Sequence, residues 1–219
     1  MPQPLVAASD FPFRPVAIQR SKWTHHFHVW SPKLARRLAL YSWQAIDFWA
    51  MIESHASILT FCELPGFILV GQRPRIADFV LRKSEGDEFV VLDGLPLSTL
   101  DAHERDILDP LPVTSVSTDA LKPHRQWIDN WLRILPYVTS NFRFITPRLI
   151  DFVEENLSSA KPLFTIERDA LPADPVLTRT AVFELARLGR LISADLNAAP
   201  LSLHTRFVRT GQIEGVHRE

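Results

Sequence analysis

The chain of 219 residues has a single cysteine, Cys62, and no long apolar run. One cysteine excludes a disulfide framework and a cysteine-rich zinc site, and it fits a reducing cytoplasm. No stretch approaches the roughly 18 apolar residues of a membrane-spanning helix. The N-terminus also lacks an apolar segment of signal-peptide length. The sequence therefore predicts a cytoplasmic protein without a membrane partner.

Several catalytic and nucleotide-binding motifs are also missing. There is no G-x-S-x-G elbow for a nucleophilic serine, and neither G-x-G-x-x-G nor G-x-x-x-x-G-K-[ST] occurs. Cys62 lies in the apolar run SILTFCEL, which favours a packed thiol over a nucleophile. Hydrolysis by a serine or cysteine nucleophile and nucleotide binding by a glycine-rich loop are therefore not predicted.

Net charge indicates no partner, because 24 Lys and Arg nearly balance 25 Asp and Glu. The distribution is less even. Six basic residues stand against one acid between Met1 and Tyr41, and eight acids stand against one arginine between Glu85 and Asp109. A basic arm indicates a polyanionic partner and an acidic connector indicates a solvated loop, although ordinary surface variation explains both equally well.

The first half of the chain predicts an extended arm, one helix and four strands. Four prolines in residues 1–21 favour an extended arm. Ser31-Pro32 predicts a helix start, and apolar residues at steps of three and four continue the helix to about His55. Ser84–Asp87 predicts a hairpin turn. The four predicted strands are SILTFCEL, FILVGQ, RIADFVLRK and EFVVLD.

The second half predicts mainly helices. TSVSTDAL contains a short strand, HRQWIDNWLRILPYV is amphipathic, and a helix over Pro147 to Leu157 has Thr146 as its cap. TRTAVFELARLG predicts a further helix that ends at Gly189. The alternating residues of RLISADLN and LSLHTRFVRT then predict a β-hairpin. A helix, a glycine and a hairpin in this order are typical of the end of a winged-helix domain.

Two stretches together resemble a known family. SPKLARRLALYSWQAIDFWAMIESHASILTFCELPGFI, followed by RPRIADFVLRK, resembles the TnsA-type endonuclease subunit of heteromeric bacterial transposases. VLTRTAVFELARLGRLISADL resembles the C-terminal helical domain of that family. The resemblance covers about residues 20 to 209. It rests on the order of these segments and on their pattern of apolar and polar residues.

The resemblance implies an α/β (α+β) fold: a restriction-endonuclease-like mixed sheet flanked by helices, followed by a helical, winged-helix-like domain. It implies an extended arm at residues 1–21, a nuclease-fold domain at 22–142 and a C-terminal domain at 143–219. The implied partners are double-stranded DNA at transposon ends, a transposase subunit and an AAA+ ATPase.

The resemblance also implies a PD-(D/E)xK metal site whose residues can be assigned one by one. The strand aspartate falls on Asp78, in the context RIADFV. The helix glutamate falls on Ala45, and the acid and lysine of the triplet fall on Val91 and Asp93. Such a site holds Mg²⁺ through carboxylate oxygens, and the metal activates water. Alanine and valine cannot bind a metal, so the sequence predicts a lost or reduced cutting activity and no required cofactor.

Alternatives remain open at this point. One alternative is an active Mg²⁺-dependent endonuclease with a migrated site, which would use Asp78 together with Asp93 or Glu63. The other is a non-catalytic scaffold that binds transposase or ATPase partners. Glu63 is otherwise interpreted as a solvent-facing acid at a strand end. His25, His26 and His28 form a cluster in which His26 and His28 share a strand face, at a spacing known for metal ligands. The predicted DNA-binding residues are Arg36, Arg37, Arg73, Arg75, Arg179, Arg206 and Arg209.

Overall fold

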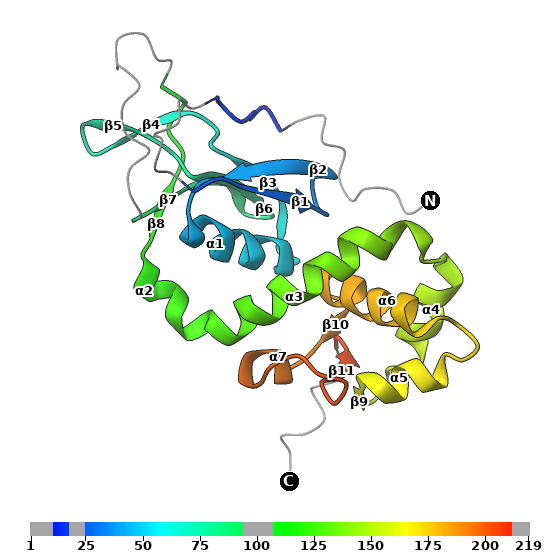
Figure 1. The fold of residues 1–219 in the computed structure, drawn as a ribbon. Helices are drawn as coiled ribbons and strands as arrows, with labels where there is room; N and C mark the ends of the chain where they lie inside the picture. Colours follow the sequence, from blue (N-terminus) through cyan, green and yellow to red (C-terminus); the bar gives the residue numbers. More distant parts are fainter. Residues whose placement is uncertain (1–10, 18–24, 94–106, 212–219) are drawn as a thin grey trace. The chain divides into compact units, whose positions relative to one another are not determined.

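The computed structural model describes residues 11–17, 25–93 and 107–211. Most of the predicted N-terminal arm and part of the predicted acidic connector therefore lie outside the described residues. The described chain is a mixed α/β protein with several small sheets and helices (Figure 1). It divides into two compact units, one holding residues 25–49 and 57–93 together with 11–17 and 107–123, the other holding 50–56 and 124–211.

The first unit contains most of the strands and is built around a four-stranded sheet in the order β3-β6-β7-β8. β3, β6 and β7 are antiparallel neighbours, and β8 runs parallel to β7. Two separate hairpins, β1–β2 and β4–β5, complete the strands. The elements are β1 (Phe27–Ser31), β2 (Arg36–Leu40), α1 (Trp43–Ser54), β3 (Ile58–Glu63), β4 (Phe67–Val70), β5 (Arg73–Ile76), β6 (Phe79–Lys83), β7 (Gly86–Leu92), β8 (Val113–Val116) and α2 (Thr118–Leu121).

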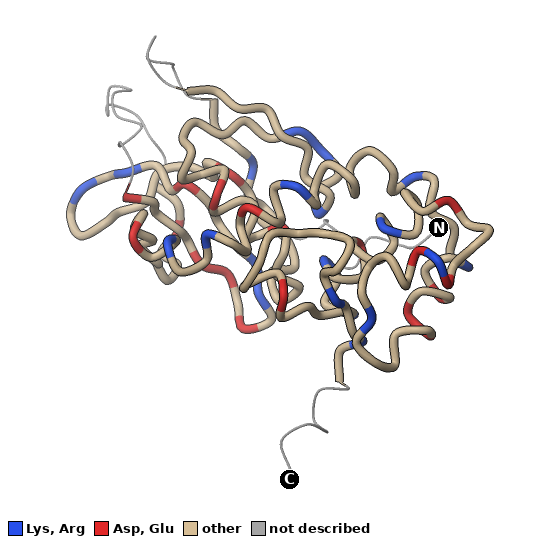
Figure 2. The backbone as a smooth tube through the Cα atoms, turned by 60° about the horizontal axis from the view of Figure 1, so that its bottom comes forward, with Lys and Arg blue, Asp and Glu red and all other residues tan. Residues whose placement is uncertain are grey.

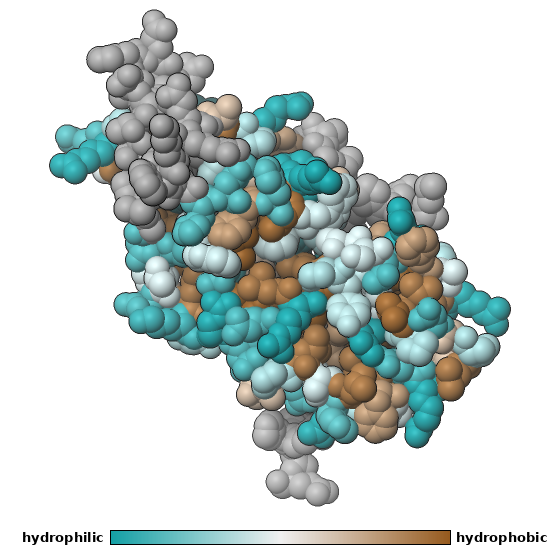
Figure 3. Space-filling view, viewed as in Figure 1, coloured by the Kyte–Doolittle hydropathy of each residue, from teal (hydrophilic) through white to brown (hydrophobic). Residues whose placement is uncertain are grey.

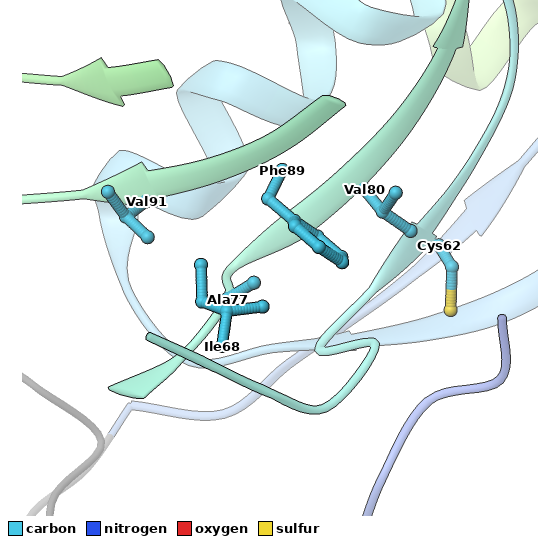
Figure 4. Packing of buried hydrophobic residues seen from close by; sticks show 6 residues of the cluster. All are labelled: Cys62, Ile68, Ala77, Val80, Phe89 and Val91. Carbon is cyan, nitrogen blue, oxygen red and sulfur yellow. The ribbon is translucent and has the colours of Figure 1, made fainter. Parts of the chain in front are cut away.

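The two faces of the four-stranded sheet bury different side chains. On one face Phe79 of β6 meets Phe48 of α1, with ring centroids 5.4 Å apart. On the other face a buried cluster converges, as Figure 4 shows, and Phe11 and Phe13 of the N-terminal segment pack against it. The cluster consists of Cys62, Ile68, Ala77, Val80, Phe89 and Val91. Alternation along β6 and β7 thus supplies both faces, as expected for a sheet covered on each side.

Residues 31–41 correct the predicted long helix. They contain the last residue of β1, the turn and β2, and helix α1 begins only at Trp43. The sequence RRLAL buries Leu38 and Leu40 at a spacing of two, which is the strand period. The Ser31 hydroxyl accepts a hydrogen bond from the Leu34 amide at 3.1 Å, so Ser31 stabilises a turn between strands instead of a helix start. Leu34 and Leu38 fit both periods, which explains the error.

The other predicted strands are confirmed with one difference. RIADFVLRK forms two strands, because β5 ends at Ile76 and β6 begins at Phe79. Between them the Ala77 amide donates to the carbonyl of Gly66, and the Asp78 amide donates to that of Val90. The backbone therefore changes its hydrogen-bonding partner at Ala77-Asp78, and Asp78 lies in the break directly before β6 instead of within a strand.

The second unit is mainly helical. Its long helix α3 packs against α6 and α7, and α4 and α5 also pack against α6. A small sheet in the order β10-β11-β9 completes the unit. The elements are a 3-10 turn (Lys122–His124) that leads in, α3 (Arg125–Asn141), a second 3-10 turn (Phe142–Phe144), α4 (Pro147–Glu155), β9 (Lys161–Pro162), α5 (Leu163–Asp169), α6 (Pro175–Arg187), β10 (Leu191–Ile192), α7 (Asp195–Ala198) and β11 (Arg206–Arg209).

The helices predicted from periodicity and capping are confirmed. The Thr146 hydroxyl accepts from the Leu149 amide and caps α4. Gly189 follows α6 with a φ of 72°, the left-handed conformation that glycine adopts at a helix end. The predicted C-terminal hairpin is present as β10 and β11, but α7 lies between the strands. Helix α3, predicted in the nuclease-fold domain, lies in the second unit.

One buried polar side chain ties α3 to a distant segment. Asn130 is fully buried, and its amide nitrogen donates to the carbonyls of Leu196 and Ala199, each at 2.8 Å. Its amide oxygen accepts from the Leu201 amide at 2.7 Å. A buried amide is stable only when its donors and acceptors are satisfied, so this side chain fixes how residues 196–201 lie on α3.

Candidate functional site

Asp78, the residue assigned to the strand aspartate, takes part in a clamp on the backbone of one residue, Leu92, at the end of β7. Its Oδ2 accepts a hydrogen bond from the Leu92 amide at 2.7 Å and from the Arg75 guanidinium at 3.3 Å. Arg75 also donates to the Leu92 carbonyl oxygen. We call this arrangement of Arg75, Asp78 and Leu92 the Leu92 clamp. Through it, residues from β5 and from the break directly before β6 hold both polar backbone groups of Leu92.

Burial dominates the electrostatics of the Leu92 clamp. Burial raises the pKa of the Asp78 carboxyl above its ordinary value, and the Leu92 amide and Arg75 offset only part of this effect. The Asp78 side chain retains 19% of its exposure. The carboxylate is thus partly shielded from water and already bound to two donors, so a cation at this position would compete with Arg75.

Asp93 lies one residue beyond the clamp and has different partners. Its Oδ1 accepts from the Gln44 side chain at 2.7 Å and from the Thr118 amide at 3.0 Å. Gln44 also donates to the Val116 carbonyl at 3.0 Å. The bond from Gln44 is the main cause that lowers the pKa of the Asp93 carboxyl, followed in the same direction by Thr118. Asp93 therefore stays ionised and ties the end of β7 to α1 and to the start of α2.

The positions assigned to the missing ligands are apolar and buried. Ala45 is 8% exposed in the first turn of α1, next to Gln44. Val91 is 2% exposed and belongs to the cluster of Figure 4, where it packs near Ala77 and Phe89. An acid at position 91 would place its oxygens among these apolar side chains, at a large desolvation cost. Valine at this position therefore serves the core.

Glu63 corrects the interpretation of a solvent-facing acid. It is 3% exposed, and both of its carboxylate oxygens accept from the Arg36 guanidinium at 2.6 Å. The hydrogen bond to Glu63 is the leading cause that raises the pKa of Arg36. Glu63 and Arg36 thus form a two-pronged ion pair between β3 and β2, so both predicted functional groups are engaged with each other.

The histidine cluster forms as the strand pattern predicts. The rings of His26 and His28 lie 4.1 Å apart, and His26 stacks on Tyr41 at 5.0 Å. His25 lies against Phe27 and Trp43 instead. Within residues 11–17, 25–93 and 107–211, no group of three or more His, Cys, Asp or Glu side chains is placed to hold a metal ion. The donor set of the described residues therefore does not fit the Mg²⁺ site that the resemblance implies.

The seven predicted DNA-binding arginines fall into two groups. Five form ion pairs within the protein: Arg36 with Glu63, Arg75 with Asp78, Arg179 with Glu167, Arg206 with Asp195 and Arg209 with Glu154. Arg37 and Arg73 are exposed and form no ion pair with a described residue. Figure 2 shows how basic and acidic residues intermingle over most of the backbone. Arg37 and Arg73 thus carry the least compensated charge in the predicted set.

Sequence reasoning missed the role of Gln44 and Arg75. Gln44 stands inside the segment YSWQA, directly before the assigned helix position, and its polarity in an apolar helix was an available signal. Arg75 was predicted to bind DNA. Its hydrogen bond to the Leu92 carbonyl depends on the placement of β5 relative to the end of β7, and no local sequence pattern indicates that placement.

Comparison with known proteins adds no assignment, because no family model, curated protein or solved structure matches the chain. In the described part of the chain no helix is long and apolar enough to span a bilayer.

Proposed function

We infer that this chain is a TnsA-like transposition protein that binds double-stranded DNA and assembles with a transposase subunit and an AAA+ ATPase, and that its own endonuclease site is lost or strongly reduced. The observation that carries this inference is the end of β7. Asp78 and Asp93 flank Leu92 there, at the sheet position where the resemblance expects a metal site, and both carboxylates bind protein groups.

The fold supports the inference at a coarse level. Helix α1 precedes a mixed sheet in which three antiparallel strands are followed by the parallel strand β8. This order agrees with a restriction-endonuclease-like sheet flanked by helices. In the second unit, α6 is followed by β10 and β11, and β9 pairs with β11. That order agrees with a winged-helix-like domain, in which the exposed Arg206 and Arg209 lie on the wing strand β11.

A second candidate function is an active metal-dependent endonuclease with a migrated site. The observation that favours it is the proximity of two carboxylates to one residue, because Asp78 binds the Leu92 amide and Asp93 follows Leu92 in sequence. Two carboxylates bind Mg²⁺ only weakly without further oxygen ligands. In this candidate, DNA phosphates complete the site.

Cleavage assays separate these two functions. Purified protein is incubated with supercoiled plasmid and Mg²⁺ or Mn²⁺, beside the variant Asp78→Asn. Asparagine keeps an oxygen that accepts from the Leu92 amide but loses the negative charge, so the fold is preserved while metal binding is weakened. The inference predicts no nicking by either protein. Nicking by the wild type that is lost in Asp78→Asn would establish the endonuclease instead.

Binding assays test the DNA role. Fluorescence anisotropy with a 40-base-pair duplex is expected to give an affinity that falls steeply with salt. Arg37→Ala should lower the slope of log K against log salt by about 0.9, the value for one lost phosphate contact. Arg125→Ala is the matched control, because Arg125 is exposed and paired with Asp129 on α3. A folded protein that binds no duplex at low salt would contradict the DNA role and favour a scaffold.

A further inference from the structure

The β4–β5 hairpin forms a two-stranded ribbon that stands apart from the main sheet (Figure 1). Gly71 and Gln72 form its two-residue turn, flanked by the pair Val70 and Arg73. All six residues from Leu69 to Pro74 are exposed, and Leu69 retains 50% of its accessible surface. The end of the ribbon is thus free of the rest of the described chain.

The base of the ribbon is fixed firmly. Ile68 is 3% exposed within the core cluster, and the Leu108 amide donates to the Phe67 carbonyl at 2.8 Å. On the returning strand, Arg75 belongs to the Leu92 clamp. A free tip on a rigid base suits an element that enters a partner, because little freedom remains to be lost on binding.

The ribbon carries only positive charge. Its sequence, FILVGQRPRI, has two arginines and no acid. Alternate residues of a strand share a face, so Arg73 lies on the same face of β5 as Arg75 and two residues nearer the tip, a step of roughly 7 Å along the strand. Figure 2 shows blue and no red at the end of this hairpin, at the left of the view, and Figure 3 shows hydrophilic side chains there. The charge complements a polyanion.

The side chains at the tip match the edges of DNA bases. The major groove, about 12 Å wide, admits a two-stranded ribbon. Arginine binds guanine through two hydrogen bonds, glutamine binds adenine in the same way, and apolar side chains contact the methyl group of thymine. Arg73, Gln72 and Val70 stand next to one another at the tip and supply one residue of each kind.

We propose that the β4–β5 ribbon enters the major groove of double-stranded DNA and reads its sequence, with Arg73 and Gln72 on base edges and Val70 on thymine methyl groups. The proposal rests on the proposed function in that the chain binds duplex DNA, and it assigns the reading element. A protein partner is disfavoured, because the tip combines positive charge without an acid and only two exposed large apolar side chains, Leu69 and Val70.

Site-directed cleavage locates the ribbon on DNA. The chain has one native cysteine, and Cys62 is buried at 1% exposure, with burial the main cause that raises its pKa to about 12. A cysteine introduced by Leu69→Cys, an exposed tip position outside the proposed reading residues, is therefore the reactive thiol, and an iron chelate attached to it cleaves nearby DNA. Glu85→Cys, in the exposed two-residue turn of the β6–β7 hairpin, is the matched control.

The expected result is cleavage confined to a few base pairs for the chelate at position 69 and weak, diffuse cleavage for the chelate at position 85. The duplex used is selected from a randomised 40-base-pair library by binding to the wild-type protein. Equal cleavage from both positions on a duplex that is bound would overturn the ribbon assignment and leave the DNA role intact. Failure of the wild type to bind any duplex would overturn both.

Substitution at the tip tests the reading role separately. Arg73→Ala should weaken binding to the selected duplex about tenfold more than binding to a scrambled duplex, because a two-bonded guanine contact is lost. Arg73→Lys should recover the salt dependence but not the preference. An equal loss on both duplexes would show a phosphate contact and overturn the reading role, as would a library that yields no preferred sequence.

Discussion

Two hairpins of the first unit, β4–β5 and β6–β7, have similar turns but different surroundings. Each has a two-residue turn with a glycine in or beside it. The β6–β7 hairpin lies within the four-stranded sheet, and its charges are neutralised across the strands by the pairs Arg82 with Asp87 and Lys83 with Glu88. The β4–β5 ribbon pairs with no strand of that sheet, and its outer arginine has no acid opposite.

The two hairpins also differ in how much of their apolar surface the fold buries. Apolar residues of β7 such as Phe89 and Val91 are buried, so the hairpin supports the fold. Leu69 and Val70 of β4 are exposed beside a cation, so the fold gains little from them. Uncompensated charge and exposed apolar surface at one tip are costs that a binding role explains.

The sharpest test of this contrast compares two large apolar side chains. Phe89→Ala should lower the free energy of unfolding by about 3–5 kcal/mol, because Phe89 is 1% exposed and packs on Phe13. Leu69→Ala should change it by less than about 0.5 kcal/mol, because Leu69 is half exposed. Urea denaturation measures both. Similar losses for the two variants would show that the ribbon tip also supports the fold.

The two turn glycines provide the next test. Gly86 has a φ of 136°, where almost only glycine is found, whereas Gly71 has a φ of 63°, where asparagine is tolerated. No atom lies within 4 Å of a Cβ added at either position, so backbone strain is isolated from crowding. Gly86→Asn should cost about 1–3 kcal/mol and Gly71→Asn less than about 1 kcal/mol. Equal shifts of the denaturation midpoint would contradict this assignment of strain.

The two arginines on one face of the ribbon should separate stability from binding. Arg75→Ala should lower the free energy of unfolding by about 1–2 kcal/mol, because it leaves the Leu92 carbonyl and Asp78 without their charged donor. Arg73→Ala should lower it by less than about 0.5 kcal/mol. Thermal unfolding followed by circular dichroism measures the pair. A larger loss for Arg73→Ala would mean that the tip is not free.

The smallest expected effect is the pH dependence of the Leu92 clamp. Because the folded pKa of Asp78 is raised, the folded protein holds this proton more tightly than the unfolded chain does. The wild type therefore loses stability from Asp78 as pH rises from about 4, the ordinary aspartate pKa, through the raised value. Asp78→Asn does not titrate.

The stability of Asp78→Asn relative to the wild type should accordingly improve with rising pH across that window and then level off. Urea denaturation at several pH values measures this difference. A relative stability that falls with pH would show that Arg75 and the Leu92 amide outweigh burial.

The sequence predicted elements whose signals are local. Helix α4 has its cap at Thr146, and α6 ends with Gly189, so both carry start or stop signals within a few residues. The hairpin turn before Gly86 is equally local. The segment of β2 and its preceding turn fits a helix as well as a strand because its apolar residues satisfy two periods, and only pairing with β1 decides between them.

The candidate site was predictable in part. Asp78 within an apolar, β-prone segment was a local signal, but the predicted strand is interrupted there, and Asp78 lies in the break between β5 and β6. The bonds from Gln44 to Asp93 and from Arg36 to Glu63 join residues that are far apart in sequence, so they depend on how α1 and β2 lie on the sheet. No pattern in the sequence encodes those placements.

The buried Asn130 side chain sets an order of events during synthesis. Its partners at Leu196, Ala199 and Leu201 follow it by 66 to 71 residues. These hydrogen bonds therefore form only after those residues have been synthesised, because contacts over such sequence distances close late. The second unit therefore cannot complete the packing of residues 196–201 on α3 until residue 201 has emerged from the ribosome.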